Sequence, residues 1–121
     1  MFFKKEINPF PVSDRVTFRN IDKTLTLSVR SGSADLVLGM KRVQERLSGM
    51  TDETPDDEQA KTARLFAETI FGKEQGEQLM QFYGSPVAVI AACGMYFKDR
   101  LSKKISKAQR RWNCKTRSRR A

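Results

Sequence analysis

The acidic residues around position 55 form the first group whose type and spacing could do chemistry. Five acids fall within one short stretch: Asp52, Glu53, Asp56, Asp57 and Glu58. Such a cluster could hold a metal ion or act as an acid–base pair. However, Thr54 is a favourable N-cap residue and Pro55 suits the first position of a helix, where acidic side chains interact favourably with the helix dipole. We therefore interpret the cluster as the solvated start of a helix.

Nucleophilic or metal chemistry has little support in the sequence. The chain has no histidine, which removes the commonest general base and metal ligand. Cys93 lies in an apolar stretch, where an inert buried thiol is expected, and Cys114 is far from it. There is no glycine-rich phosphate loop and no paired-cysteine spacing. We expect no catalytic residue, no metal and no cofactor, so we interpret the chain as a non-enzyme.

The C-terminal segment concentrates the positive charge of the chain. Residues 98–121 hold eleven Lys/Arg and one acid, whereas residues 1–97 hold twelve Lys/Arg and thirteen acids. A run of this kind binds polyanions by counterion release, and an aromatic side chain within it can stack on a base. The candidate residues for a nucleic acid or an acidic protein are Lys103, Lys104, Lys107, Arg110, Arg111, Trp112, Lys115, Arg117, Arg119 and Arg120. A solubilising tail with no dedicated ligand remains an alternative.

The stretch from residue 82 to residue 105 predicts the central helix of the fold, against which the other elements would pack. Ser85 can cap a helix and Pro86 suits its first position, and residues 86–97 are almost all apolar or small. Ile90, Gly94, Phe97, Leu101 and Ile105 then recur at helical spacing. We expect a helix at 86–106 whose first half is buried all round in the core.

The rest of the chain predicts a mainly helical α+β fold with one domain at 15–106. Alternating apolar residues predict a β-hairpin at 15–29, and apolar stripes between break signals predict helices at 34–48, 55–71 and 73–83. Ser33 is the expected N-cap of the first of these helices. Residues 1–14, which contain Pro9 and Pro11, are expected to form an extended arm, and residues 107–121 a disordered basic tail.

The sequence has no recognisable membrane-spanning segment or signal peptide, which bears on the cellular location of the protein. The apolar run at 86–97 is shorter than the roughly 20 residues that span a bilayer, and no apolar signal region follows Lys4 and Lys5. Two isolated cysteines also fit a reducing compartment. We expect a soluble intracellular protein with no membrane partner.

A second candidate function is partner binding through an apolar surface rather than through charged residues. The chain has eight phenylalanines and five methionines, more soft and aromatic surface than a small two-layer core readily buries. Any surplus would form a face for a helical or extended partner. The candidate residues, either core or partner-binding, are Leu36, Met40, Val43, Phe66, Phe82 and Phe97.

The segment IFGKEQGEQLMQFYG at 70–84, followed by a long helix ending in Lys/Arg, resembles the small tail assembly chaperones of long-tailed phages that infect Gram-positive hosts. The resemblance covers residues 60–105 and, more loosely, the hairpin. Gly76 replaces the helix-forming residue usual in that family, and the basic end with Trp112 also departs from it.

The resemblance implies a transient, non-catalytic chaperone in the host cytoplasm that is absent from the mature virion. It would coat the helical tape measure protein, keep it soluble and recruit tail-tube subunits. Homo-oligomerisation and a frameshifted longer form are left open by the sequence. The alternative is a small basic nucleic-acid-binding protein that acts through its C-terminal tail.

Overall fold

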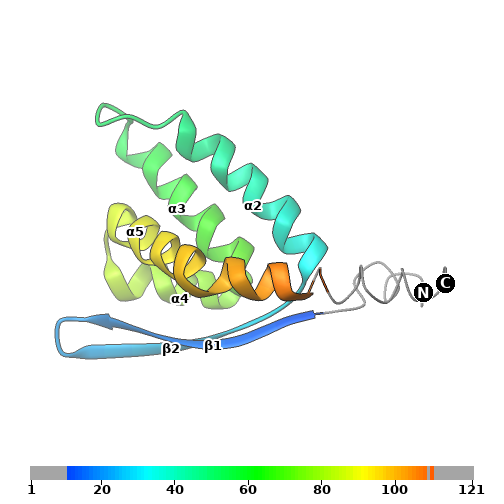
Figure 1. The fold of residues 1–121 in the computed structure, drawn as a ribbon. Coiled ribbons are helices and arrows are strands. Elements are labelled where there is room, and N and C mark those ends of the chain that lie inside the picture. Colours follow the sequence, from blue (N-terminus) through cyan, green and yellow to red (C-terminus); the bar gives the residue numbers. More distant parts are fainter. Residues whose placement is uncertain (1–10, 109, 111–121) are drawn as a thin grey trace, which may run out of the picture.

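The computed structural model describes residues 11–108 and residue 110, which form a β-hairpin layer packed against a layer of helices (Figure 1). This arrangement confirms the predicted mainly helical α+β class. The predicted arm at 1–10 and the tail positions 109 and 111–121 lie outside the described residues. No helix in the described part of the chain is long and apolar enough to cross a membrane.

The hairpin is longer than the sequence predicted. Strand β1 (Pro11–Asn20) pairs antiparallel with β2 (Lys23–Gly32), so residues 11–14 belong to the strand rather than to the expected arm. Pro11 is tolerated because it is the first residue of its strand, where a missing N–H costs little. Apolar residues alternate toward the helices, including Val16 opposite Leu27 and Phe18 opposite Leu25.

The hairpin turn consists of the two residues Ile21 and Asp22. Ile21 has a φ of 60° and is 95% exposed. A β-branched residue in this left-handed region is strained, since such turns favour glycine or asparagine. The turn is nevertheless held in place, because the Asn20 side-chain amide donates a hydrogen bond of 3.0 Å to the Phe82 carbonyl.

Four helices follow the hairpin, close to the predicted bounds: α2 (Ser33–Ser48), α3 (Asp56–Phe71), α4 (Lys73–Tyr83) and α5 (Pro86–Tyr96). Ser85 caps α5 as predicted, accepting a hydrogen bond of 3.4 Å from the Ala88 N–H. The other two predicted N-caps are wrong. Gly32 precedes α2 and Ser33 is buried inside its first turn, while Pro55 precedes α3. The Thr54 hydroxyl instead accepts from Thr51 within the preceding loop.

The predicted single helix at 86–106 contains a π-helical turn, η1 (Phe97–Leu101), and continues as α-helix over 102–108. The Ser102 N–H reaches the Phe97 carbonyl, which is the five-residue spacing of a π turn. The turn adds one residue to the helix without interrupting it. It therefore shifts the phase of every side chain that follows.

The predicted apolar stripe was consequently one residue out of phase over the first half of this helix. The buried positions are Val89, Cys93 and Tyr96, followed after a five-residue step by Leu101, Ile105 and Ala108. Ile90, Gly94 and Phe97 are only half-buried. The prediction assumed an uninterrupted α-helix. A π turn adds one residue, so the buried positions before and after it cannot follow a single α-helical period.

Helix α3 is the centre of the fold, since it contacts α2, α4, α5 and β2. Its buried face carries Ala63, Phe66, Ala67 and Ile70. The small residues on this face let neighbouring helices approach closely. At Gly76 on α4, an added Cβ would lie 2.8 Å from Glu68 Cγ on α3, which explains why glycine replaces the expected helix former.

Candidate partner-binding surface

The candidate apolar residues divide between the interior and a groove on the surface. Leu36, Val43 and Phe66 are buried in the core, so they are not available to a partner. Met40 is also buried, but it contributes to the groove, together with half-buried Phe97. Phe82 is half-buried at the end of α4, where its ring packs edge-on against Tyr83 at 5.0 Å.

The groove runs between α2 and the final helix and has a volume of about 310 Å³. Its exposed surface is mainly apolar, although half of the lining residues are polar. It is lined by Val37, Met40, Lys41, Gln44, Phe97, Ser102, Ile105 and Ser106. A groove between two helices is the geometry that receives an amphipathic helix from a partner.

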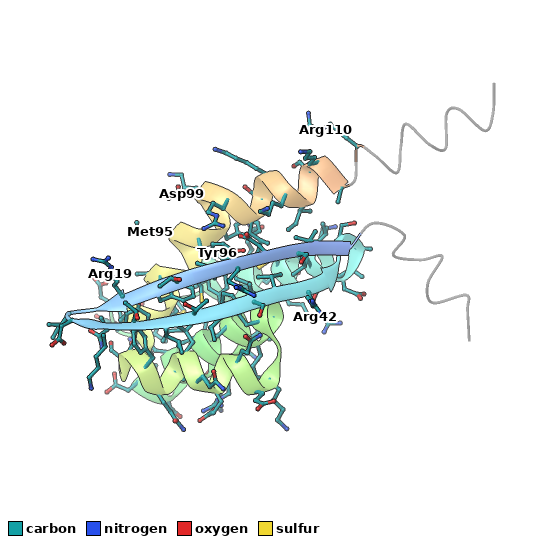
Figure 2. The ribbon with its side chains drawn as sticks, turned by 90° about the horizontal axis from the view of Figure 1, so that it is seen from below. Arg19, Arg42, Met95, Tyr96, Asp99 and Arg110 are labelled. Carbon is teal, nitrogen blue, oxygen red and sulfur yellow. The ribbon has the colours of Figure 1, made fainter. Side chains whose placement is uncertain are left out.

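Helix α5 adds an apolar face that the sequence analysis placed in the core. Val87 is 60% exposed and Met95 is 67% exposed, and Ala91 between them is exposed as well. These three positions are spaced four residues apart and so lie on one face. A Cβ added at Gly94 would meet nothing within 4 Å. Met95 points away from the hairpin (Figure 2).

The expectation that the first half of this helix is buried all round is therefore wrong. Helix α5 is apolar on every side, but among the helices of the bundle it packs mainly on α3 and α4. A small domain has too few elements to surround such a helix. The number of predicted elements could have revealed the exposed face. One hairpin and three other helices are too few to cover every side of a helix that has no polar side.

The final helix is fixed to the hairpin through Asp14, a carboxylate on the apolar face of β1 whose side chain is 8% exposed. It accepts a hydrogen bond of 2.7 Å from the Tyr96 hydroxyl and one of 2.8 Å from Arg100. The Lys104 ammonium lies 3.7 Å away. These contacts orient the π turn, and with it Phe97 at the groove.

Burial alone would raise the pKa of Asp14. Hydrogen bonds from Tyr96 and from the Arg15 backbone, with the charges of Arg100 and Lys104, outweigh it and hold that pKa below its usual value. Burial and the hydrogen bond to Asp14 raise the pKa of Tyr96, so its hydroxyl stays protonated and donates.

Only part of the predicted basic site lies in the described residues. Lys103, Lys107 and Arg110 are exposed, whereas Lys104 faces Asp14. The remaining six positions lie outside the described part of the chain: Arg111, Trp112, Lys115, Arg117, Arg119 and Arg120.

The remaining candidate groups have structural surroundings. Cys93 is buried between helices, and burial raises the pKa of its thiol to about 12. Asp56, Asp57 and Glu58 occupy the exposed first turn of α3. Within residues 11–108 and 110, no three Cys, Asp or Glu side chains are grouped to hold a metal ion.

The segment that carries the family resemblance forms the joint between the helices and the hairpin. Gln75 bonds both backbone groups of Ser28 on β2, and the Tyr83 hydroxyl donates to the Arg19 carbonyl on β1. Arg64 on α3 pairs with Glu77 on α4, and this hydrogen bond lowers the pKa of Glu77. The segment thus joins α3 and α4 to the hairpin, and none of its residues lines the groove.

Comparison with known proteins gives no further assignment: the chain matches no protein-family model, no curated protein and no solved structure.

Proposed function

We propose that this protein is a tail assembly chaperone of a long-tailed phage or prophage, which shields apolar helical segments of the tape measure protein during tail assembly. The observation that carries the proposal is the exposed apolar face of α5, made of Val87, Ala91 and Met95. An apolar helix face of this kind costs solubility unless a partner covers it.

The groove beside this face supports the same role. Phe97 continues the helix that carries the α5 face and also lines the groove against Val37 and Met40. Together the two surfaces offer shallow apolar contacts with few fixed polar groups. Such contacts suit reversible coating, since the chaperone must later be displaced by tail-tube subunits. We place this activity in the host cytoplasm, with no catalytic step.

The test is co-expression with the tape measure protein of the same phage. The wild-type chain should raise the soluble fraction of the tape measure protein and co-purify with it. The double variant Val87→Glu/Met95→Glu should lose at least about tenfold in co-purified partner, because two buried charges would each oppose the contact. Ile21→Glu is the matched control, since Ile21 is also apolar and exposed but belongs to the hairpin turn and not to the α5 face.

Equal loss in the control and in the α5 variant would contradict the assignment of the surface. A tape measure protein that stays insoluble with the wild-type chain would contradict the function itself.

The nucleic-acid-binding alternative keeps one observation in its favour, the exposure of Lys103, Lys107 and Arg110 along the final helix. Wild-type binding to nucleic acid that disappears when these three are changed to Gln would favour it.

A further inference from the structure

The outer face of the hairpin has an unusual composition. Every side chain that points away from the helices is exposed, and each is an arginine or carries a hydroxyl: Ser13, Arg15, Thr17, Arg19, Thr24, Thr26, Ser28 and Arg30. Between residues 13 and 30 this face carries no acidic and no apolar side chain. Seen from below, the hairpin lies in front of the helices, so none of the described elements covers this face (Figure 2).

The positive charge of this face is not neutralised within the described part of the chain. The side chains of Arg15, Arg19 and Arg30 make none of the ion pairs found there. Asp14, the acid next to Arg15, points to the opposite side, where it binds Tyr96 and Arg100. The three guanidiniums therefore present their donors to solvent.

Two of the arginines border a hollow of about 400 Å³. Ser13 lies directly opposite Arg30, and Arg15 directly opposite Ser28, so arginines and hydroxyls alternate across the two strands. Side chains of directly opposite residues are near neighbours. The hollow is lined by Arg15, Arg30 and the hydroxyls of Ser13 and Ser28, and also by Asp14. The Asp14 carboxylate is already paired with Tyr96, Arg100 and Lys104. Guanidiniums and hydroxyls are the donors that proteins use for phosphate oxygens.

The edges of the hairpin are partly closed, which directs a ligand to the face. On β2, Gln75 binds the Ser28 N–H at 2.9 Å and the Ser28 carbonyl at 2.8 Å. On β1, the carbonyls of Arg19 and Arg15 accept from Tyr83 at 3.0 Å and Arg100 at 3.3 Å. A third strand would have to break these hydrogen bonds, so strand addition is disfavoured.

The chemistry of the face selects its partner. A protein interface normally has an apolar centre, and a site for single-stranded nucleic acid normally has aromatic side chains for stacking; this face has neither. Arginines and hydroxyls without apolar groups fit the phosphates of a duplex. The A-form major groove of RNA is too narrow to admit side chains, whereas that of B-DNA admits a two-stranded ribbon.

We infer that the outer face of the hairpin binds the phosphate backbone of double-stranded DNA, with the hollow between Arg15 and Arg30 as its main contact. The spacing is suitable, because Arg15 and Arg19 are about 13 Å apart along an extended strand, close to the roughly 12 Å width of the major groove. This site is separate from the α5 face and does not depend on the proposed chaperone function.

The experiment compares two full-length variants of equal net charge. One carries Arg15→Gln, Arg19→Gln and Arg30→Gln; the control carries Arg42→Gln, Arg46→Gln and Lys73→Gln, three exposed positions on α2 and α4. Binding to a labelled mixed-sequence DNA duplex is measured by fluorescence anisotropy over a salt series. Both variants keep the C-terminal basic residues, so any binding by that segment is common to both.

The hairpin variant should lose at least about tenfold in affinity, and the slope of log K against log salt should fall by about three, since each phosphate contact contributes about 0.9. The control should lose less than about threefold. Circular dichroism melting checks that both variants remain folded. Equal losses in the two variants, or no binding of the duplex by the wild-type chain, would overturn the inference.

A charge-neutral variant tests the hollow itself. Ser13→Ala/Ser28→Ala removes two hydroxyls and leaves the net charge unchanged, so a several-fold loss would support direct contact with phosphate. Unchanged affinity would overturn the hollow as the contact. Polyglutamate serves as competitor: displacement of the duplex at equal charge concentration would show a preference for acidic protein and would overturn the choice of DNA.

Discussion

The Asp14 carboxylate shows how the molecule tolerates a charge on the apolar face of its hairpin. Its oxygens receive hydrogen bonds from Tyr96 and Arg100, and the Arg100 guanidinium also lies 5.7 Å from the centre of the Tyr96 ring. A buried carboxylate is costly unless it is paired in this way. Because its partners lie in α5 and η1, the group joins the first strand to the last helix.

Asp14→Asn should lower the free energy of unfolding by about 2 kcal/mol at neutral pH, the usual contribution of hydrogen bonds to a charged group. The pKa of Asp14 is lowered in the folded state, so its stabilisation is present above the unfolded pKa and is lost as the pH falls through the folded pKa. The difference between wild type and variant, measured by urea unfolding, should therefore shrink below about pH 4.

The control for this prediction is Asp22→Asn, which removes the same charge from the exposed turn. A constant difference between wild type and Asp14→Asn from pH 7 down to pH 2.5 would contradict the ionic role assigned to Asp14.

The buried thiol supplies a second test at the level of single residues. Cys93 is fully buried, and the raised pKa of about 12 leaves almost no thiolate at neutral pH. In a Cys114→Ser background, Cys93 should react with a thiol reagent at the rate of unfolding and at full speed in denaturant. Rapid reaction under native conditions would contradict the position of α5 in the core.

At the scale of secondary structure elements, close packing of α3 and α4 depends on a residue without a side chain. An added Cβ at Gly76 would lie 3.0 Å from the Glu68 backbone nitrogen and 3.1 Å from its Cα. Backbone atoms cannot move aside as a flexible side chain can, so the helices themselves would have to separate. The hydrogen bonds from Gln75 to Ser28 depend on the same placement of α4.

Gly76→Ala should therefore destabilise the protein by about 1–3 kcal/mol, the usual cost of overpacking, despite the better helix propensity of alanine. Gly94→Ala is the matched control on α5, where open space surrounds the glycine; it should gain up to about 1 kcal/mol. Denaturant unfolding measures both. A stabilised Gly76→Ala variant would show that α3 and α4 do not approach closely here.

At the scale of the whole molecule, an aromatic cluster joins the two layers. The Phe18 ring on β1 packs edge-on against Phe71, Tyr83 and Tyr96 at centroid distances of 5.6, 6.3 and 6.4 Å. An isolated hairpin is marginally stable in water. Its folding must therefore depend on these contacts with the helices, and the two layers should unfold together.

Phe18→Ala should cost about 3–5 kcal/mol, as for other buried aromatic residues, and should leave a single unfolding transition by circular dichroism. Phe82→Ala, which removes a half-buried ring, should cost less. If the variant lost strand signal while the helices kept their wild-type midpoint, the layers would be independent and the prediction would be wrong.

The amino-acid sequence by itself determined the local elements. Alternating apolar and polar residues predicted the hairpin, and Gly49, Gly72 and Gly84 predicted where helices end. Both signals depend only on residues that are neighbours in the sequence. The sequence also indicated that Cys93 is buried. The bounds of α4 and the start of α5 were predicted to the residue.

Only the tertiary structure decided which surfaces are left for partners. Helix α5 is apolar on all sides, so its periodicity could not show that Val87 and Met95 face outward. The π turn shifted which positions of the last helix are buried. The hydrogen-bond partners of Asp14, including Tyr96, lie more than eighty residues away in the sequence. The physical reason is that burial of a helix face depends on the elements packed around it, and their number and placement are not local properties of the chain.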